Sequence, residues 1–176
     1  MRLQQCLVFV VLAMVGCSSE GPTIEPLSDS DLSELASIDF DGLKQRVSDN
    51  KGKLVVTAFW SSDGKDSKAV YAELGALCAA KGQDAPLLLA VNIDRPDDVR
   101  KNTLPFLREQ KTTFENRVYK GDVMMLMNWF GQDWSGWLPA ICIHNADGQV
   151  VGKFFGKNAA KQASATLKQL TEDDEG

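Results

Sequence analysis

The sequence is poor in the residues on which metal, redox and nucleic-acid chemistry depend. Its 176 residues include one histidine and four cysteines, and its 19 lysines and arginines are outnumbered by 24 aspartates and glutamates. The net charge of −5 argues against a nucleic-acid partner, because nucleic-acid-binding domains are normally basic. Four cysteines are too few for a small scaffold held by disulfides, and no cysteine or histidine pair has the spacing of a metal site. We therefore expect no metal and no other cofactor.

Long apolar runs are also scarce, and the clearest one lies near the N-terminus. A mean hydropathy of −0.19 excludes a polytopic membrane protein. After Arg2, the segment Leu7–Val15 is wholly apolar. At ~1.5 Å per residue such a segment is too short, as a helix, to cross a hydrocarbon core of ~30 Å. Its length and its flanking residues are typical of a secretory signal peptide.

The end of this run, Met14-Val15-Gly16-Cys17, resembles the lipobox of bacterial lipoproteins. The resemblance implies cleavage before Cys17 and a diacylglyceryl group on its thiol, which would anchor the protein to a membrane. A plain signal peptide with a chance cysteine is the alternative. Ser18 follows the anchor residue, and by the same resemblance it favours the outer membrane over the inner one, in a periplasm-facing position. We expect a signal peptide at 1–16, a flexible tether at 17–39, one domain at 40–170 and an acidic tail at 171–176.

The domain itself is predicted to be α/β. The segments 54–60 and 86–93 are nearly continuous apolar runs, as expected for strands that are buried on both faces. Amphipathic helices are predicted before, between and after them, with Pro105 interrupting the helix at 97–110. Asn145-Ala146-Asp147-Gly148 joins two further strands in a hairpin. This order predicts a mixed sheet with helices on both faces.

Three local signatures in this domain resemble the thioredoxin-like fold, and in particular the secreted, membrane-tethered, TlpA-like family. The segment 52–60 (GKLVVTAFW) resembles the strand that enters the redox site. Leu138-Pro139-Ala140 resembles the cis-proline element, and Asp147-Gly148-Gln149-Val150-Val151 followed by Gly156 resembles the terminal hairpin. The resemblance covers roughly residues 40–170 and implies a thioredoxin-like mixed sheet.

The redox motif of that family is degenerate in this chain. The resemblance implies a Cys-x-x-Cys pair at the start of the following helix, where the helix dipole stabilises a thiolate. Gly64 and Ser67 occupy the two cysteine positions, with Lys65 and Asp66 between them. We expect Ser62 or Asp63 to cap a helix that has lost its chemistry. A polar site for a small molecule, built from Lys65, Asp66 and Ser67, is a second interpretation.

The two remaining cysteines and the single histidine do not replace the missing pair. Cys78 lies on the apolar face of a predicted helix and Cys142 lies in a predicted strand, so both are expected to be buried structural thiols without a mutual disulfide. His144 is expected at the surface, beside a turn. A thiol-disulfide oxidoreductase or antioxidant protein that uses Cys142 or Cys78 is the alternative function.

Our first hypothesis is a redox-inactive, lipid-anchored protein of the cell envelope that binds a peptide or protein partner. In the family that this chain resembles, the residue before the cis-proline pairs with an extended peptide, and that residue is Leu138 here. The predicted peptide groove comprises Trp60, Trp134, Trp137, Leu138 and Pro139. Trp60 is expected at the entrance of the site. For Trp134 and Trp137, which flank Gly136 on a loop, binding and core packing are both open.

Overall fold

The computed structural model describes residues 35–79, 85–112, 114–131 and 134–173. The predicted signal peptide, the predicted anchor residue Cys17 and most of the predicted tether lie outside these residues. Within the described ranges, no helix has the length and apolar character needed to span a bilayer.

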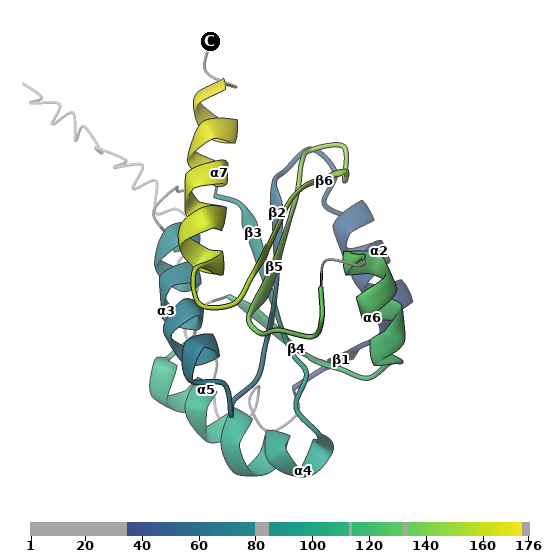
Figure 1. Ribbon diagram of the computed structural model, residues 1–176, viewed down its shortest axis with the longest axis vertical. Coiled ribbons are helices and arrows are strands. Elements are labelled where there is room, and N and C mark those ends of the chain that lie inside the picture. Colours follow the sequence, from purple (N-terminus) through teal and green to yellow (C-terminus); the bar gives the residue numbers. More distant parts are fainter. Residues whose placement is uncertain (1–34, 80–84, 113, 132–133, 174–176) are drawn as a thin grey trace, which may run out of the picture.

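A six-stranded mixed sheet forms the centre of the molecule, with strand order β1-β4-β3-β2-β5-β6 (Figure 1). The α/β class predicted from the sequence is confirmed. The elements are β1 (Ser37–Ile38), α2 (Phe40–Ser48), β2 (Val55–Trp60), α3 (Lys65–Ala79), β3 (Leu87–Asn92), α4 (Pro96–Asp98), the π-helical turn η2 (Val99–Thr103), α5 (Leu104–Gln110), β4 (Glu115–Tyr119), α6 (Val123–Phe130), β5 (Ala140–His144), β6 (Val150–Phe155) and α7 (Ala159–Asp173).

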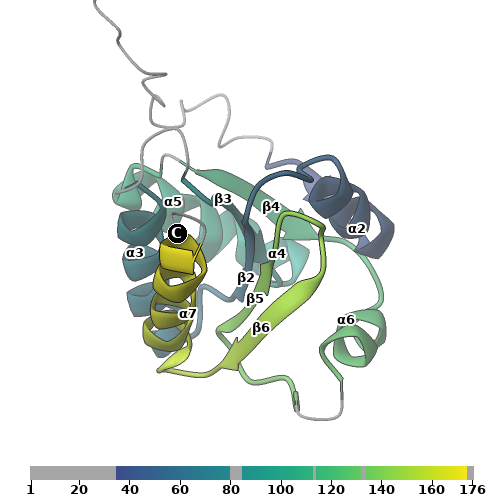
Figure 2. The ribbon, with the colours of Figure 1, turned by 90° about the horizontal axis from the view of Figure 1, so that it is seen from above.

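Helices cover both faces of this sheet, as Figure 2 shows. On one face, α3 and α7 pack on β2 and β5 around apolar side chains such as Val56, Leu74 and Leu167. On the other face, α2 and α6 pack on the same strands around Leu43, Phe59 and Leu126. All positions of β2 and β5 are therefore buried, which explains why these strands read as apolar runs instead of alternating patterns.

The sheet is wider than the sequence pattern predicts, because β1 and β4 carry no apolar run. The segment Glu115–Tyr119 is polar in its first half, and only its last two residues are buried. It pairs in parallel with β3 on one side and with the two-residue strand β1 on the other. A strand near the sheet edge buries little side-chain area, so its sequence carries a weak signal. The domain also begins before residue 40, since Leu35 packs against the core.

The helical segment after β3 is interrupted at the predicted proline, but not by a simple kink. A π-helical turn, Val99–Thr103, lies directly before α5, in which Pro105 occupies the first turn. A proline lacks an N–H donor, so a wider turn before it disrupts fewer backbone hydrogen bonds. At the other end of the chain, α7 continues to Asp173, so the predicted acidic tail is partly helical.

The register of the sheet brings two strand ends together. β2 and β3 run in parallel with Trp60 opposite Asn92, so the loops that follow them emerge side by side. β5 runs antiparallel to β2, with Ala140 opposite Phe59, so the segment before β5 reaches the same end of the sheet. This end, close to α4 in Figure 1, contains the candidate site.

Candidate functional site

The four residues predicted to form a degenerate redox motif, Gly64 to Ser67, lie at the start of α3, and the Ser67 side chain is buried there. Gly64 precedes the helix, and its carbonyl accepts the N–H of Lys68 at 3.2 Å. Ser67 is buried, with 1% of its surface exposed, and its Oγ accepts the N–H of Ser61 at 3.4 Å. A Cβ added to Gly64 would lie 2.6 Å from Ser67 Oγ. The space at the first cysteine position is therefore already taken by the Ser67 hydroxyl.

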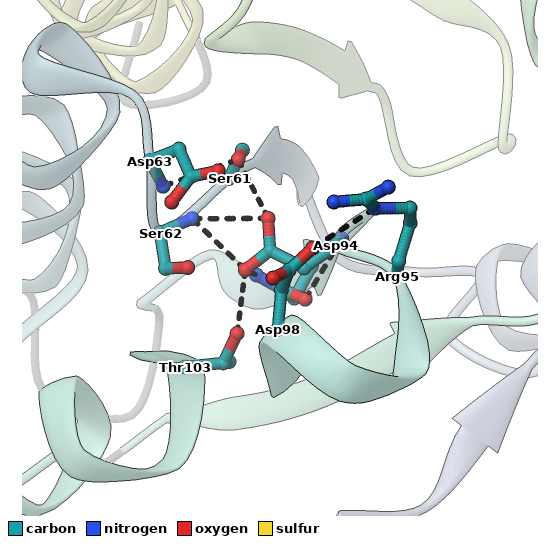
Figure 3. Close-up of polar contacts among 8 residues, drawn as sticks. Ser61, Ser62, Asp63, Asp94, Arg95, Asp98 and Thr103 are labelled. Atoms are coloured by element: carbon teal, nitrogen blue, oxygen red, sulfur yellow. Dashed lines mark hydrogen bonds and ion pairs between the residues drawn. The ribbon is translucent and has the colours of Figure 1, made fainter. Parts of the chain in front are cut away.

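The loop before α3 is held by a carboxylate from the neighbouring strand end. Asp94 follows β3, and Figure 3 shows its carboxylate facing Ser61, Ser62 and Thr103. Ser61 Oγ donates to it at 2.6 Å, and the Ser62 N–H donates at 3.0 Å. Thr103 Oγ1, from the π-helical turn, donates at 2.5 Å, and Asn92 Nδ2 donates at 2.9 Å. Four donors from three segments of the chain thus converge on one carboxylate.

These hydrogen bonds keep Asp94 ionised without a cationic partner. Burial alone raises the pKa of Asp94, but the hydrogen bonds from its four partner residues outweigh burial, so its pKa lies below the ordinary value. The adjacent Arg95 turns away and pairs with Asp98 at 3.0 Å (Figure 3). Among the described residues no cation forms an ion pair with Asp94. A fixed negative charge next to this loop is unfavourable for a thiolate in the same place.

Ser62 is not the helix cap that the sequence suggested as one of two candidates, and the Asp94 cluster was not predicted at all. Gly64 directly precedes the first helical turn, and the buried Ser62 hydroxyl has no hydrogen-bond partner among the described residues, so Ser62 does not cap the helix. A signal for the cluster was present: Asp94 comes immediately after a buried strand, and polar residues at adjacent parallel strand ends meet. The sequence contains no comparable signal for the hydrogen bond from Thr103 to Asp94, because the π-helical turn positions Thr103.

The polar site predicted from Lys65, Asp66 and Ser67 is not assembled in the described residues. Ser67 is buried against Ser61, whereas Asp66 is exposed. The side chain of Lys65 lies outside what the structure describes. The small-molecule interpretation of this helix start therefore gains no support.

The segment before β5 has the backbone that the resemblance implies. The peptide bond between Leu138 and Pro139 is cis, Pro139 is buried, and its carbonyl accepts the Gly156 N–H at 2.8 Å. Leu138 is half-buried. Within the described part of the chain, no hydrogen bond uses the backbone N–H or carbonyl of Leu138. These two groups are available to pair with an added strand.

The three tryptophans of the predicted groove have different environments. Trp60 is 2% exposed and packs against Tyr71 and Phe106, so its expected place at the site entrance is wrong. Because β2 is covered on both faces, a ring at its end is enclosed. Trp134 is 3% exposed and is a core residue. Trp137 is 70% exposed, and it alone of the three presents its ring at the surface.

Cys142 is a buried free thiol, as the sequence predicts, whereas His144 is not at the surface. Burial raises the pKa of Cys142 to about 12, although Lys153 opposes the shift, so the thiol is protonated at neutral pH. His144 is 2% exposed, because the strand that carries it is covered by α6. The side chain of Cys78 lies outside what the structure describes. In the described residues, no three His, Cys, Asp or Glu side chains gather as metal ligands do.

Comparisons with known proteins identify the fold. No family model and no curated protein matches the sequence. Among solved structures, the chain is similar to StoA from Bacillus subtilis, at 22% identity and a TM-score of 0.50, over 66% of this chain and 83% of that one. It is similar to the thioredoxin domain of a thiol-disulfide oxidoreductase from Bacteroides vulgatus, at 20% identity and a TM-score of 0.51, over 68% and 82%.

A third similar structure is a thiol:disulfide interchange protein of the thioredoxin family from Chlorobium tepidum. The identity is 13% and the TM-score is 0.56, over 69% of this chain and 82% of that one. At these identities the likeness concerns the fold alone. The protein has the thioredoxin-like fold that the three sequence signatures imply.

Proposed function

We propose that this protein is a redox-inactive, thioredoxin-like protein of the cell envelope that binds a peptide or protein partner beside its cis-proline. The observation that carries the proposal is that one end of the sheet lacks the redox sulfur atoms but retains backbone groups that can pair with a peptide. The two positions for redox sulfur hold Gly64 and Ser67, while Leu138 offers free backbone groups next to the exposed Trp137. What is left at this site is a binding surface.

Two features of the chain support the loss of redox chemistry. The donors around the motif already have oxygen acceptors: the Ser61 N–H faces Ser67 Oγ, and the Ser62 N–H faces Asp94. The buried thiol of Cys142, with a pKa near 12, has almost no thiolate at neutral pH, and thiolate is the form that attacks disulfides. The lack of thiolate argues against the alternative function, in which Cys142 would attack disulfides.

Two features support peptide binding. An extended segment could add to the chain at Leu138 by strand pairing, a mode in which main-chain hydrogen bonds give affinity. Trp137 is an aromatic ring with 70% exposure on the adjoining residue, and such rings are frequent sources of binding energy at interfaces. Its carbonyl is fixed by the Trp134 Nε1–H at 2.7 Å, which anchors the exposed residue to the core.

Attachment to the membrane is proposed from the N-terminal sequence. The short apolar run, followed directly by Gly16-Cys17, supports a lipid on Cys17, and Ser18 favours the periplasmic face of the outer membrane. A domain held at the end of a tether meets partners that are confined to the same membrane at raised effective concentration. Weak strand pairing at Leu138 is sufficient under such conditions.

The redox part of the proposal predicts that the mature protein does not catalyse reduction of insulin by dithiothreitol. The expected rate equals that of dithiothreitol alone, because neither motif position holds sulfur and the Cys142 thiol is buried. A Cys-x-x-Cys oxidoreductase serves as the positive control, and Cys142→Ser as the matched variant. Catalysis that disappears in Cys142→Ser would establish the alternative function instead.

The binding part predicts that Trp137→Ala reduces partner capture from detergent-solubilised envelopes by about tenfold or more, the loss expected for a hot-spot aromatic residue. The free energy of unfolding should change by no more than about 0.5 kcal/mol, because the ring is exposed. Met124→Ala is the matched control, since Met124 is 57% exposed on α6 and lies outside the loop. Undiminished capture by Trp137→Ala, or equal loss in both variants, would contradict the proposed binding surface.

A further inference from the structure

A second candidate site lies at the opposite end of the sheet from Asp94. A cleft of about 280 Å³ is lined by α2, the turn between β5 and β6, and the end of α6. The register fixes its place: His144, which lines the cleft, pairs with Val55 at the beginning of β2, whereas Trp60 at the other end of that strand adjoins the redox position. Figure 1 shows the β5–β6 turn near α2, far from α4.

The wall formed by the turn is held in position by the backbone. The Gly52 N–H donates to the Ala146 carbonyl at 2.8 Å and ties the turn to the segment after α2. Gly148 has a φ of +81°, a conformation that favours glycine. A Cβ on Gly148 would meet Val47 Cγ1 at 3.7 Å and Lys51 Cε at 3.8 Å, so the Lys51 side chain runs along the turn.

The residues that line the cleft include more lysines than acidic residues, although the whole chain is acidic. Two of its lining residues are lysines, Lys44 and Lys51, and one is acidic, Asp147. Lys44 Nζ forms an ion pair with Asp41 Oδ1 at 2.7 Å and lies over the Phe40 ring. Among the described residues Lys51 has no ion pair. Since Lys44 already has Asp41 as a partner, Lys51 is the lysine of the cleft that is best suited to hold an anion.

The floor of the cleft is aromatic, and it includes a buried polar atom without a partner. Trp129 and His144 stack with ring centroids 5.5 Å apart and an interplanar angle of 17°. His144 is 2% exposed, and its Nδ1 has no hydrogen-bond partner. Burial lowers the pKa of His144, and the Val55 backbone opposes this shift. Neutral imidazole can donate or accept one hydrogen bond at such a floor.

We propose that this cleft binds a small organic anion, with Lys51 and Lys44 holding a carboxylate or phosphate group and Trp129 contacting a flat ring. The cleft volume of about 280 Å³ lies just below the range of roughly 300–1,000 Å³ that is typical of ligand sites, so the ligand should be small. Ser48, which also lines the cleft, offers a hydroxyl to the same anionic group. The site is separate from the proposed peptide surface, so either can fail without the other.

The single histidine of the chain makes this proposal directly measurable. In the full-length protein in neutral detergent, the imidazole resonances of His144 are followed by NMR while benzoate, phenyl phosphate or inorganic phosphate is added. Benzoate and phenyl phosphate should give saturable shifts in the millimolar range or below, with inorganic phosphate weaker because it lacks a ring. Absence of saturable shifts with both aromatic anions would overturn the proposal.

Lys51→Gln and Lys53→Gln form a matched pair for the same titration. Both remove one positive charge from neighbouring positions, but only Lys51 lines the cleft. Loss of a charged hydrogen-bond donor predicts about tenfold weaker binding in Lys51→Gln, whereas Lys53→Gln should change affinity by less than about twofold, as for a screened surface charge. Equal weakening in both variants would show a general electrostatic effect and would overturn the assigned site. The His144 signal also reports that each variant is folded.

Discussion

Replacing Trp134 with alanine should lower the free energy of unfolding by about 3–5 kcal/mol, the cost usual for removing a large buried aromatic side chain. The ring is 3% exposed, lies 4.5 Å from Phe130 and stacks on Phe155 at 6.4 Å between centroids. Its Nε1–H also donates to the Trp137 carbonyl at 2.7 Å. Alanine would leave a cavity at the end of the α2–α6 core and release the loop.

Denaturant unfolding at neutral pH measures this effect, and two variants separate its parts. Trp134→Phe retains an aromatic ring but removes the indole donor, so it should cost less than Trp134→Ala. Trp137→Ala, three residues along, should cost little because its ring is exposed. If Trp134→Ala and Trp137→Ala destabilised the protein equally, the division of the loop into a core tryptophan and a surface tryptophan would be wrong.

Asp94→Ala should lower the free energy of unfolding by about 2–4 kcal/mol. Each hydrogen bond to a charged group typically contributes about 1.5–3 kcal/mol, but the contributions are not additive and Asp94 is only partly buried. Alanine would leave Ser61 Oγ, the Ser62 N–H and Thr103 Oγ1 without their acceptor. Asp94→Asn keeps one acceptor oxygen and should show a smaller loss. A loss below about 0.5 kcal/mol in Asp94→Ala would place it among ordinary surface substitutions.

The same carboxylate should make stability depend on acid. Since the pKa of Asp94 is lower in the folded protein than in the unfolded chain, its contribution is complete above the unfolded value of about 4. The contribution declines as the pH falls below that value and through the folded pKa, where the hydrogen-bonded carboxylate becomes protonated. The free energy of unfolding should therefore be higher in the wild type than in Asp94→Asn at about pH 6, and the two values should converge as the pH is lowered to about 2.5.

Asp94 also explains how the loop before α3 is held in place without a cysteine pair. In a Cys-x-x-Cys protein, the amides at the helix start stabilise a thiolate when it forms. Here the Ser62 N–H has a permanent acceptor in Asp94, and Ser61 bridges Asp94 and Ser67. The loop is ordered by an oxygen network that does not change its charge at neutral pH. The partner proposed to bind at Leu138 would therefore meet a loop whose hydrogen bonds involve no sulfur.

The sequence by itself determined the α/β class, the two central strands and the terminal hairpin. These follow from local signals: apolar runs in 54–60 and 86–93, and turn residues in Asn145-Ala146-Asp147-Gly148. It also determined that sulfur is absent at positions 64 and 67, and that Cys142 belongs in a core strand. Each of these properties depends on a residue and its near neighbours along the chain.

Only the tertiary structure decided which polar and aromatic side chains are enclosed. Trp60 and His144 are at strand ends, where exposure depends on the helices that pack there, and both are buried. Asp94 joins its own strand end to the loop at Ser61, which is 33 residues away in the sequence. Lys51 and Trp129 line one cleft because α2 and α6 lie on the same face of the sheet. Such contacts depend on the register of parallel strands and on helix packing, which local sequence patterns do not encode.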